Sequence, residues 1–176
     1  MKKLNVRLRL AEGMDPWYSD VPMDSPEAAI QAMRGLLGEM DREYFCVVNL
    51  NAKNCPLNYN VIFIGKVNMA PVRLADVFKS SLLSNAKRAL LFHNHPSGDP
   101  APSDDDYAVT EKLMEAGEIL GIRVLDHVIV GGGRYFSFRE TGLLEGWKQS
   151  FRKKWKDSGG REKTVSAGRK SIRSRR

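Results

Sequence analysis

The sequence predicts an α/β protein built on a mixed central sheet. Segments rich in β-forming residues alternate with amphipathic segments of helical spacing, in the order β-α-β-β-α-β-α-β-β. Two neighbouring strands are joined by a connection too short for a crossover, so they are expected to be antiparallel. The length of 176 residues suits one domain with a substantial core, and no internal repeat is visible.

Residues 1–40 are predicted to form a strand and a helix that lead into the domain or pack on it. Apolar residues alternate over residues 3–10, which indicates a strand at a sheet edge. Glycine and two prolines then mark residues 12–23 as a connecting loop. The helix is predicted to begin after Ser25, an N-cap residue followed by proline, and to continue at helical spacing to about Met40.

The domain itself is predicted over residues 41–147. It opens with a central strand at 43–50, where aromatic and β-branched residues are concentrated. An asparagine-rich turn leads into a second strand at 58–67, antiparallel to the first. Apolar residues at helical spacing then predict a helix over 74–83, which covers one face of the sheet.

The second half of the domain is predicted to continue with a short buried strand at 89–93. A helix follows from Asp104 to Gly121, a glycine suited to the left-handed conformation at a helix end. The last two strands, at 122–130 and 134–138, flank three consecutive glycines and form a hairpin.

Positive charge is concentrated at the end of the chain. Residues 148–176 carry twelve Lys and Arg against two acidic residues, or +10, so the net charge of +7 leaves residues 1–147 at −3. A basic tail is therefore predicted over 148–176, disordered after about Asp157. It either solubilises the terminus or binds nucleic acid without sequence preference, with cations for phosphates and Trp155 for base stacking.

Composition favours a cytoplasmic protein that does not associate with membranes. The first residues contain no continuous apolar stretch of the kind found in signal peptides, and no apolar run is long enough to span a bilayer. The two cysteines, Cys46 and Cys55, cannot form a disulfide framework, and Cys46 is expected to be a small core residue. A reducing compartment is the simplest interpretation.

The chemically informative stretch covers residues 90–106. Because residues two apart on a strand point to the same face, His93 and His95 leave the buried strand toward one point. A loop rich in proline and glycine follows, and Ser103 is placed to cap a helix that carries Asp106 in its first turn. Two imidazoles and one carboxylate are the three protein ligands of a catalytic zinc that keeps its fourth position open.

The spacing His93-x-His95, seven residues, Ser103, two residues, Asp106 resembles the JAMM motif of the JAB/MPN metalloprotease superfamily. The surrounding letters, HNHPSGDPAPSDDD, are similar to the RadC-like branch, and the resemblance extends over about residues 41–144. It implies a three-layer α-β-α fold and a zinc-dependent hydrolase that cleaves peptide or isopeptide bonds. Zinc would lower the pKa of its water toward about 7.

The resemblance implies which residues hold Zn²⁺. His93 and His95 would be two ligands, and the motif spacing selects Asp106 as the third. The rival carboxylates nearby are Asp99, Asp104 and Asp105. The acids at 104 and 105 are explained without a metal, since negative charge at a helix N-terminus is favoured by the helix dipole.

The resemblance also implies catalytic roles. JAMM enzymes use an upstream glutamate as general base, and Glu43, at the start of an early strand, matches it, with Asp41 as a rival. Ser103 would help to stabilise the oxyanion, although its role as helix N-cap alone explains its presence. His127, which follows Asp126 in a stretch similar to RadC-like proteins, is expected to be structural or to support the ligands.

The chain also departs from the RadC-like pattern. Gly-Thr-Leu commonly follows the second strand in that branch, and here residues 65–67 read Gly-Lys-Val. A His-Pro-Arg-Glu segment further on has become Pro-Val-Arg-Leu-Ala at 71–75. The alternative function is a DNA-associated accessory protein with a structural or vestigial metal site, since RadC-like proteins carry a DNA-repair label. The motif places a water and does not identify a substrate or an oligomeric state.

Overall fold

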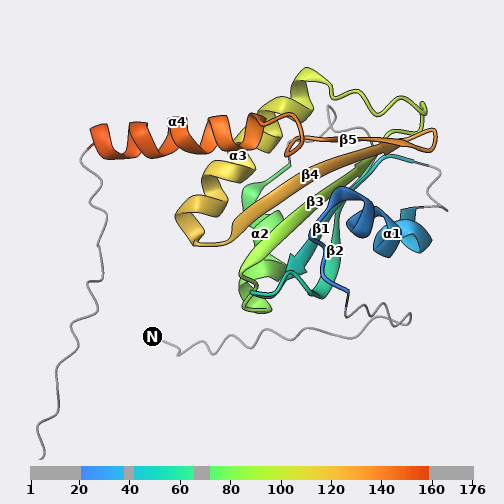
Figure 1. The fold of residues 1–176 in the computed structure, drawn as a ribbon, viewed down its shortest axis with the longest axis horizontal. Helices are drawn as coiled ribbons and strands as arrows, with labels where there is room; N and C mark the ends of the chain where they lie inside the picture. The colour runs from blue at the N-terminus through green and yellow to red at the C-terminus, as the bar shows by residue number, and fades with distance from the viewer. Residues whose placement is uncertain (1–20, 38–41, 66–71, 159–176) are drawn as a thin grey trace, which may run out of the picture.

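The computed structural model describes residues 21–37, 42–65 and 72–158 of the chain (Figure 1). Its elements are, in order, α1 (Pro26–Leu37), β1 (Tyr44–Leu50), β2 (Pro56–Ile64), α2 (Leu74–Leu83), β3 (Arg88–Asn94), α3 (Asp104–Leu120), β4 (Arg123–Gly131), β5 (Arg134–Ser137) and α4 (Leu143–Asp157). The strand predicted over 3–10 lies outside the described residues. The α2 and α3 segments agree with the helices predicted from apolar spacing.

The five strands form one mixed sheet in the order β2-β1-β3-β4-β5. β1 is antiparallel to both of its neighbours, β2 and β3. β3 runs parallel to β4, and this pairing requires the crossover that α3 provides. β4 and β5 form the predicted antiparallel hairpin. The predicted α/β class with a mixed sheet is therefore confirmed.

Helices cover both faces of this sheet and make three layers. Along β3, Ala89 and Leu91 face a core shared with α2, α3 and α4, whereas Leu90 and Phe92 face a second core shared with α1. This alternation follows from the two-residue period of a strand. Both cores are apolar, so β3 is buried on its two faces and forms the rigid centre from which the histidine motif leaves.

The prediction was wrong about the start of the C-terminal segment. Residues 148–157, assigned to a basic tail, form the second half of α4. Leu144 is buried, Trp147 packs on the core, and Phe151 and Trp155 continue the same spacing with ring centroids 6.0 Å apart. Because α4 also carries many Lys and Arg residues, its composition alone does not reveal these apolar residues at helical spacing. Figure 1 shows that the far half of α4 extends away from the rest of the fold.

The structure contains no membrane-spanning candidate in the ranges that it describes, because none of these helices is both long enough and apolar enough.

Two helical glycines offer a matched test of packing. Gly117 is buried in α3, and a Cβ there would lie 2.5 Å from the backbone oxygen of Ile122. Gly117→Ala is expected to lower the free energy of unfolding by about 1–3 kcal/mol, because the overpacking exceeds the gain in helix propensity. Chemical denaturation measures this change.

Gly146→Ala is the control for that substitution. Gly146 lies in α4, and a Cβ there would meet no atom within 4 Å. This variant is expected to raise the free energy of unfolding by about 0.5–1 kcal/mol through helix propensity alone. A stabilising effect of both alanines would contradict the close contact at Gly117.

Candidate metal centre

The register of the sheet brings the predicted site residues to one place. Phe45 of β1 is paired with His93 of β3 in an antiparallel ladder. Glu43 precedes Phe45 by two residues and His95 follows His93 by two, so both continue the same sheet face just beyond the ladder. This face is the one that packs against α2 and α3.

His93 is buried between two carboxylates. Its Nε2 lies 2.6 Å from Glu43 Oε1, and its Nδ1 lies 3.1 Å from Asp106 Oδ1. A carboxylate can only accept, so in the neutral ring Nε2–H donates to Glu43 and Nδ1 keeps its lone pair. His93 Nδ1 and Asp106 Oδ1 are buried and make no hydrogen bond. Two facing acceptors without a proton between them favour a cation at this position.

His95 is oriented by the loop that follows it. Its Nδ1 lies 2.8 Å from the backbone oxygen of Asp99, and because a carbonyl only accepts, Nδ1 carries the proton. The lone pair is therefore on Nε2, which lies 3.6 Å from Asp106 Oδ2. A histidine whose second nitrogen donates to a carbonyl is the usual arrangement of a metal ligand.

Asp106 is held by the first turn of α3. The Ser103 hydroxyl donates to Asp106 Oδ2 at 2.6 Å, and the Ser103 N–H donates to the same oxygen at 2.8 Å. The Asp106 N–H donates to Ser103 Oγ at 3.2 Å, which completes a capping box and confirms Ser103 as the N-cap. Asp104 and Asp105 are exposed, so Asp106 is the acid of this turn that points into the protein.

The electrostatics of Asp106 suit a cation. Burial raises the pKa of this carboxyl, but the His93 ring in its protonated form and the hydrogen bonds from Ser103 lower it by more. Its pKa is therefore well below the usual range, and the group carries a negative charge at neutral pH. An ionised carboxylate with one oxygen left unpaired is an available metal ligand.

The structure thus assembles four side chains that the sequence had singled out. Donor atoms of Glu43, His93 and His95 lie within 4.8 Å of one another, so this group could hold a metal ion. Asp106 approaches both histidines at 3.1 and 3.6 Å. Two imidazole nitrogens and a carboxylate oxygen are a donor set that suits zinc. Which three of the four bind the metal stays a prediction.

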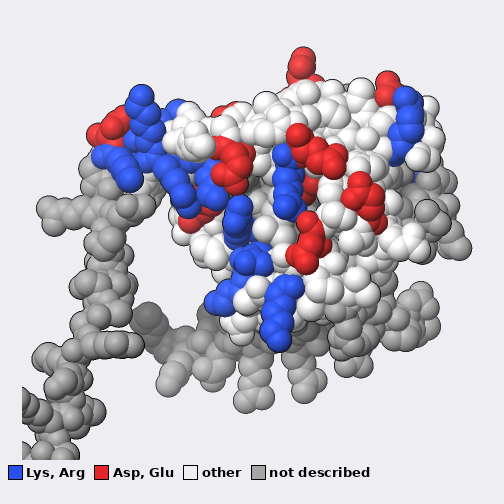
Figure 2. All heavy atoms as spheres, in the orientation of Figure 1, with Lys and Arg blue, Asp and Glu red and all other residues white. Residues whose placement is uncertain are grey.

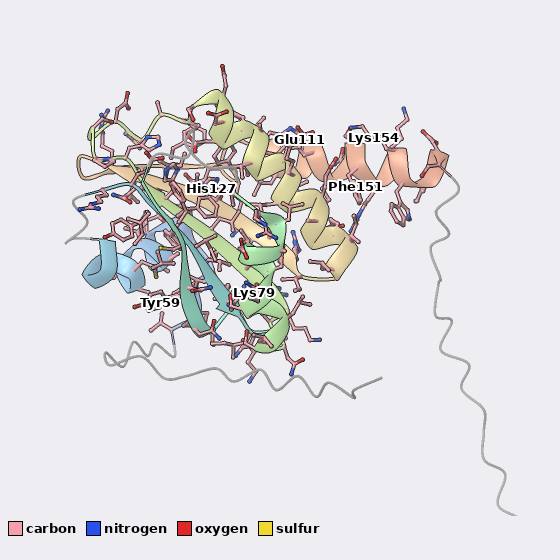
Figure 3. All side chains as sticks on the ribbon, turned by 180° about the vertical axis from the view of Figure 1, so that it is seen from behind. Tyr59, Lys79, Glu111, His127, Phe151 and Lys154 are labelled. Atoms are coloured by element: carbon pink, nitrogen blue, oxygen red, sulfur yellow. The ribbon has the colours of Figure 1, made fainter. Side chains whose placement is uncertain are left out.

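A second layer of contacts supports Asp106 through His127, which was expected to be structural or to support the ligands, and through Thr110, which the sequence did not single out. The Thr110 hydroxyl donates to the backbone oxygen of Asp106 and lies 2.6 Å from His127 Nδ1, which therefore donates to it. The His127 ring stacks on Phe138 at 5.1 Å and lies nearly parallel to His93 at 6.1 Å. Burial lowers the pKa of His127, so its ring is neutral. Figure 3 labels His127 in the interior of the fold. The one available signal for Thr110 was its position one helical turn after Asp106.

The β4–β5 hairpin supports the loop after His95. The His95 N–H donates to the backbone oxygen of Val130 at 2.8 Å. At Gly132 the backbone φ is +55°, and a Cβ there would lie 2.5 Å from the Gly98 carbonyl oxygen. Glycine is therefore required at this turn both for its conformation and for the close approach of the loop.

A sheet enclosed by helices, with His-x-His leaving a central strand and Ser-x-x-Asp opening the next helix, has the architecture of JAB/MPN domains. The sequence profile of the RadC-like JAB domain matches residues 23–143, and the chain belongs to this family. The resemblance stated from the motif is confirmed.

Curated relatives carry the name UPF0758 protein. The relative from Methanococcoides burtonii is 51% identical over 106 residues, which are 60% of this chain and 46% of the relative. A relative from Desulfitobacterium hafniense is 45% identical over 123 residues, 70% of this chain and 52% of its own. A third, from Caldanaerobacter subterraneus, is 47% identical over 121 residues, with coverages of 69% and 52%. The chain spans about half the length of these relatives, and their name states no activity.

Proposed function

We propose that this chain is a zinc-dependent hydrolase that cleaves a peptide or isopeptide bond. The observation that carries the proposal is the facing pair of unpaired buried acceptors, His93 Nδ1 and Asp106 Oδ1, at 3.1 Å. Burying such groups without partners is costly, and a divalent cation would remove that cost. Membership of a family within a generally hydrolytic superfamily supports the same function.

His93, His95 and Asp106 are the residues that would hold the metal. Each already has a partner that fixes it: Glu43 for the first, the Asp99 carbonyl for the second and Ser103 for the third. When bound, zinc supplies a Lewis acid that polarises a carbonyl group and acidifies a water molecule at neutral pH.

Glu43 is the residue that would move the proton. Its side chain is partly exposed, and Oε1 lies 2.6 Å from His93 Nε2. In the proposed reaction this oxygen takes a proton from the attacking water and returns it to the leaving amine. Donation from His93 holds the carboxylate in place for both transfers.

Ser103 is the candidate donor to the oxyanion. Its hydroxyl donates to Asp106 Oδ2, and that oxygen also accepts from the Ser103 N–H. Turning the hydroxyl toward a substrate oxygen would therefore leave Asp106 with one donor. Because Ser103 is exposed at the N-terminus of α3, its O–H can reach a bound substrate and benefit from the helix dipole.

Metal analysis combined with a hydrolysis assay tests this function. The purified full chain is expected to contain about one zinc ion, and linear and isopeptide-linked peptides serve as substrates. Chelation is expected to remove both zinc and cleavage, and added zinc to restore both. A protein that holds no stoichiometric zinc even after loading would refute the proposal.

We also infer a cytoplasmic location. Burial raises the pKa of the Cys46 thiol to about 12. A buried, protonated thiol is unreactive, and a cysteine kept in this form suits a reducing compartment.

A second candidate function is binding of nucleic acid through α4. Figure 2 shows Lys and Arg side chains gathered on α4 and continuing across the face beside it. Four cations line a cavity of about 500 Å³ next to this helix, and they are Arg88, Arg123, Arg139 and Lys148. Three acids share that cavity, so the more strongly basic surface is the far half of α4.

Salt-dependent binding of a single-stranded oligonucleotide tests this second function. Lys153 and Lys154 are exposed on α4, next to Trp155, which is 47% exposed and available for stacking. Replacing both lysines with alanine is expected to reduce the slope of log K against log salt by about 1.4. Lys79→Ala on α2, far from α4 in Figure 3, is the control. Equal slopes for all three proteins would refute a role for α4.

A further inference from the structure

Asn94 stands between the two histidines of the motif and is the last residue of β3. It is buried, with 6% of its surface exposed. Strand alternation places its side chain off the face that carries His93 and His95. Neither the motif nor the proposed reaction gives it a role.

Both polar atoms of the Asn94 amide form hydrogen bonds with residues about fifty positions earlier in the chain. Oδ1 accepts from the Tyr44 N–H at 2.7 Å, and Nδ2 donates to the Arg42 carbonyl at 2.7 Å. The orientation of the amide follows from this pair of contacts, since the N–H can only donate and the carbonyl can only accept.

The amide replaces a missing peptide group in the sheet. The antiparallel ladder between β1 and β3 ends at the pair Phe45 and His93, whereas Asn94 is still paired with Val130 of β4. The backbone of Asn94 is therefore not part of the ladder with β1. The side chain of Asn94 supplies the acceptor and the donor that a longer ladder would have supplied.

The two contacts hold the residues on either side of Glu43. On the other side of the chain, the Gly65 N–H donates to the Glu43 carbonyl at 2.8 Å. The backbone of Glu43 is therefore held from both β3 and β2, although this residue precedes the first residue of β1. Its carboxylate consequently meets His93 Nε2 at 2.6 Å.

We propose that Asn94 is a positioning residue that fixes Glu43 against the histidine pair. It acts through the backbone of residues 42 and 44 and touches no reacting atom. The contribution of Asn94 to catalysis rests on the proposed function. Its effect on the position of Glu43 does not depend on that function. The structure therefore allows the placement to be tested without any substrate.

The test is nitrogen and proton NMR of the His93 ring in the metal-free full chain. Glu43→Ala, which removes the acceptor altogether, provides the reference spectrum for loss of the contact between His93 and the carboxylate. In Asn94→Ala the His93 signals are expected to shift toward that reference. Asn94→Asp keeps the acceptor for Tyr44 but loses the donor for Arg42, so an intermediate shift is expected. His93 signals that match the unmodified protein in both variants would overturn the proposal.

Asn58→Ala is the control for loss of an asparagine in the same sheet. Asn58 lies on β2 and accepts from Asn49, away from the histidines, so its replacement is expected to leave the His93 signals unchanged. Hydrogen exchange of the Tyr44 amide in the unmodified protein needs no variant at all. Protection is expected because that N–H donates to Asn94, and exchange at the rate of an open amide would overturn the proposal.

Activity then separates positioning from a merely structural role. If hydrolysis is found, Asn94→Ala is expected to lower kcat about tenfold or more, with KM and zinc content changed less than about twofold. A protein without hydrolysis would refute the proposed function and leave the NMR result standing. An unchanged kcat in a variant whose His93 signals have shifted would overturn the catalytic value of the contact.

Discussion

Replacing His95 with alanine is expected to abolish zinc binding and hydrolysis together while the fold stays intact. The His95 side chain contacts the His93 ring and is not part of either apolar core, so its removal is expected to leave both cores intact. Loss of a residue that merely supports a ligand typically lowers metal affinity 10–100-fold. Loss of a ligand is therefore expected to cost more than about 100-fold. Metal content, together with the thermal unfolding midpoint, measures both effects.

Asp99→Asn is the matched control in the same loop. Asp99 supports His95 through its backbone oxygen, and its side chain is 68% exposed. The substitution removes one acidic charge without removing that backbone acceptor. It is expected to keep full zinc content. If His95→Ala also kept one zinc per chain, then His95 would not be a ligand, and the predicted set would have to be replaced.

The predictable part of this centre is local. The two-residue period of a strand places His93 and His95 on one face, and the capping chemistry of Ser103 places Asp106 in the first turn of α3. Both are decided by residues a few positions apart. Helices α2 and α3 were predictable for the same reason, since apolar spacing marks both of them and Gly121 marks the end of α3.

The contacts between distant segments of the chain could not be predicted from periodicity. Glu43 meets His93 because β1 and β3 are neighbours with Phe45 opposite His93, and nothing local encodes which strands pair or in which register. Resemblance to JAMM enzymes, rather than pattern, selected Glu43. Asn94 was missed because an amide that completes a ladder has no sequence signature of its own.

Helix α4 was missed for a different physical reason. Its cations dominate composition, while the apolar stripe that anchors it is narrow: one buried leucine and three aromatic residues at helical spacing. Arg152 also pairs with Glu118 of α3 at 3.1 Å, an interhelical contact that charge counting cannot reveal. A tail and a basic surface helix have the same composition and differ only in this spacing.

Glu43→Gln is expected to separate catalysis from metal binding. Glutamine keeps the size of the side chain and an acceptor oxygen, so the contact with His93 Nε2 can survive. It cannot take up a proton at neutral pH, and loss of a general base typically costs about 10²–10⁴-fold in rate. Hydrolysis is therefore expected to fall in this range while zinc stays at about one per chain.

The same variant decides between the two groups of three ligands. If Glu43, His93 and His95 bind the metal, Glu43→Gln is expected to lower zinc affinity, whereas Asp106→Asn is expected to spare it. If Asp106 is the third ligand, the outcomes are reversed, because Asp106 Oδ1 is the buried acceptor without a partner. Asp41→Asn, the rival acid, is the comparison for catalysis and is expected to keep full hydrolysis. Zinc affinity measured on all three variants at one pH distinguishes these arrangements, and a drop in rate for Asp41→Asn alone would remove Glu43 as the base.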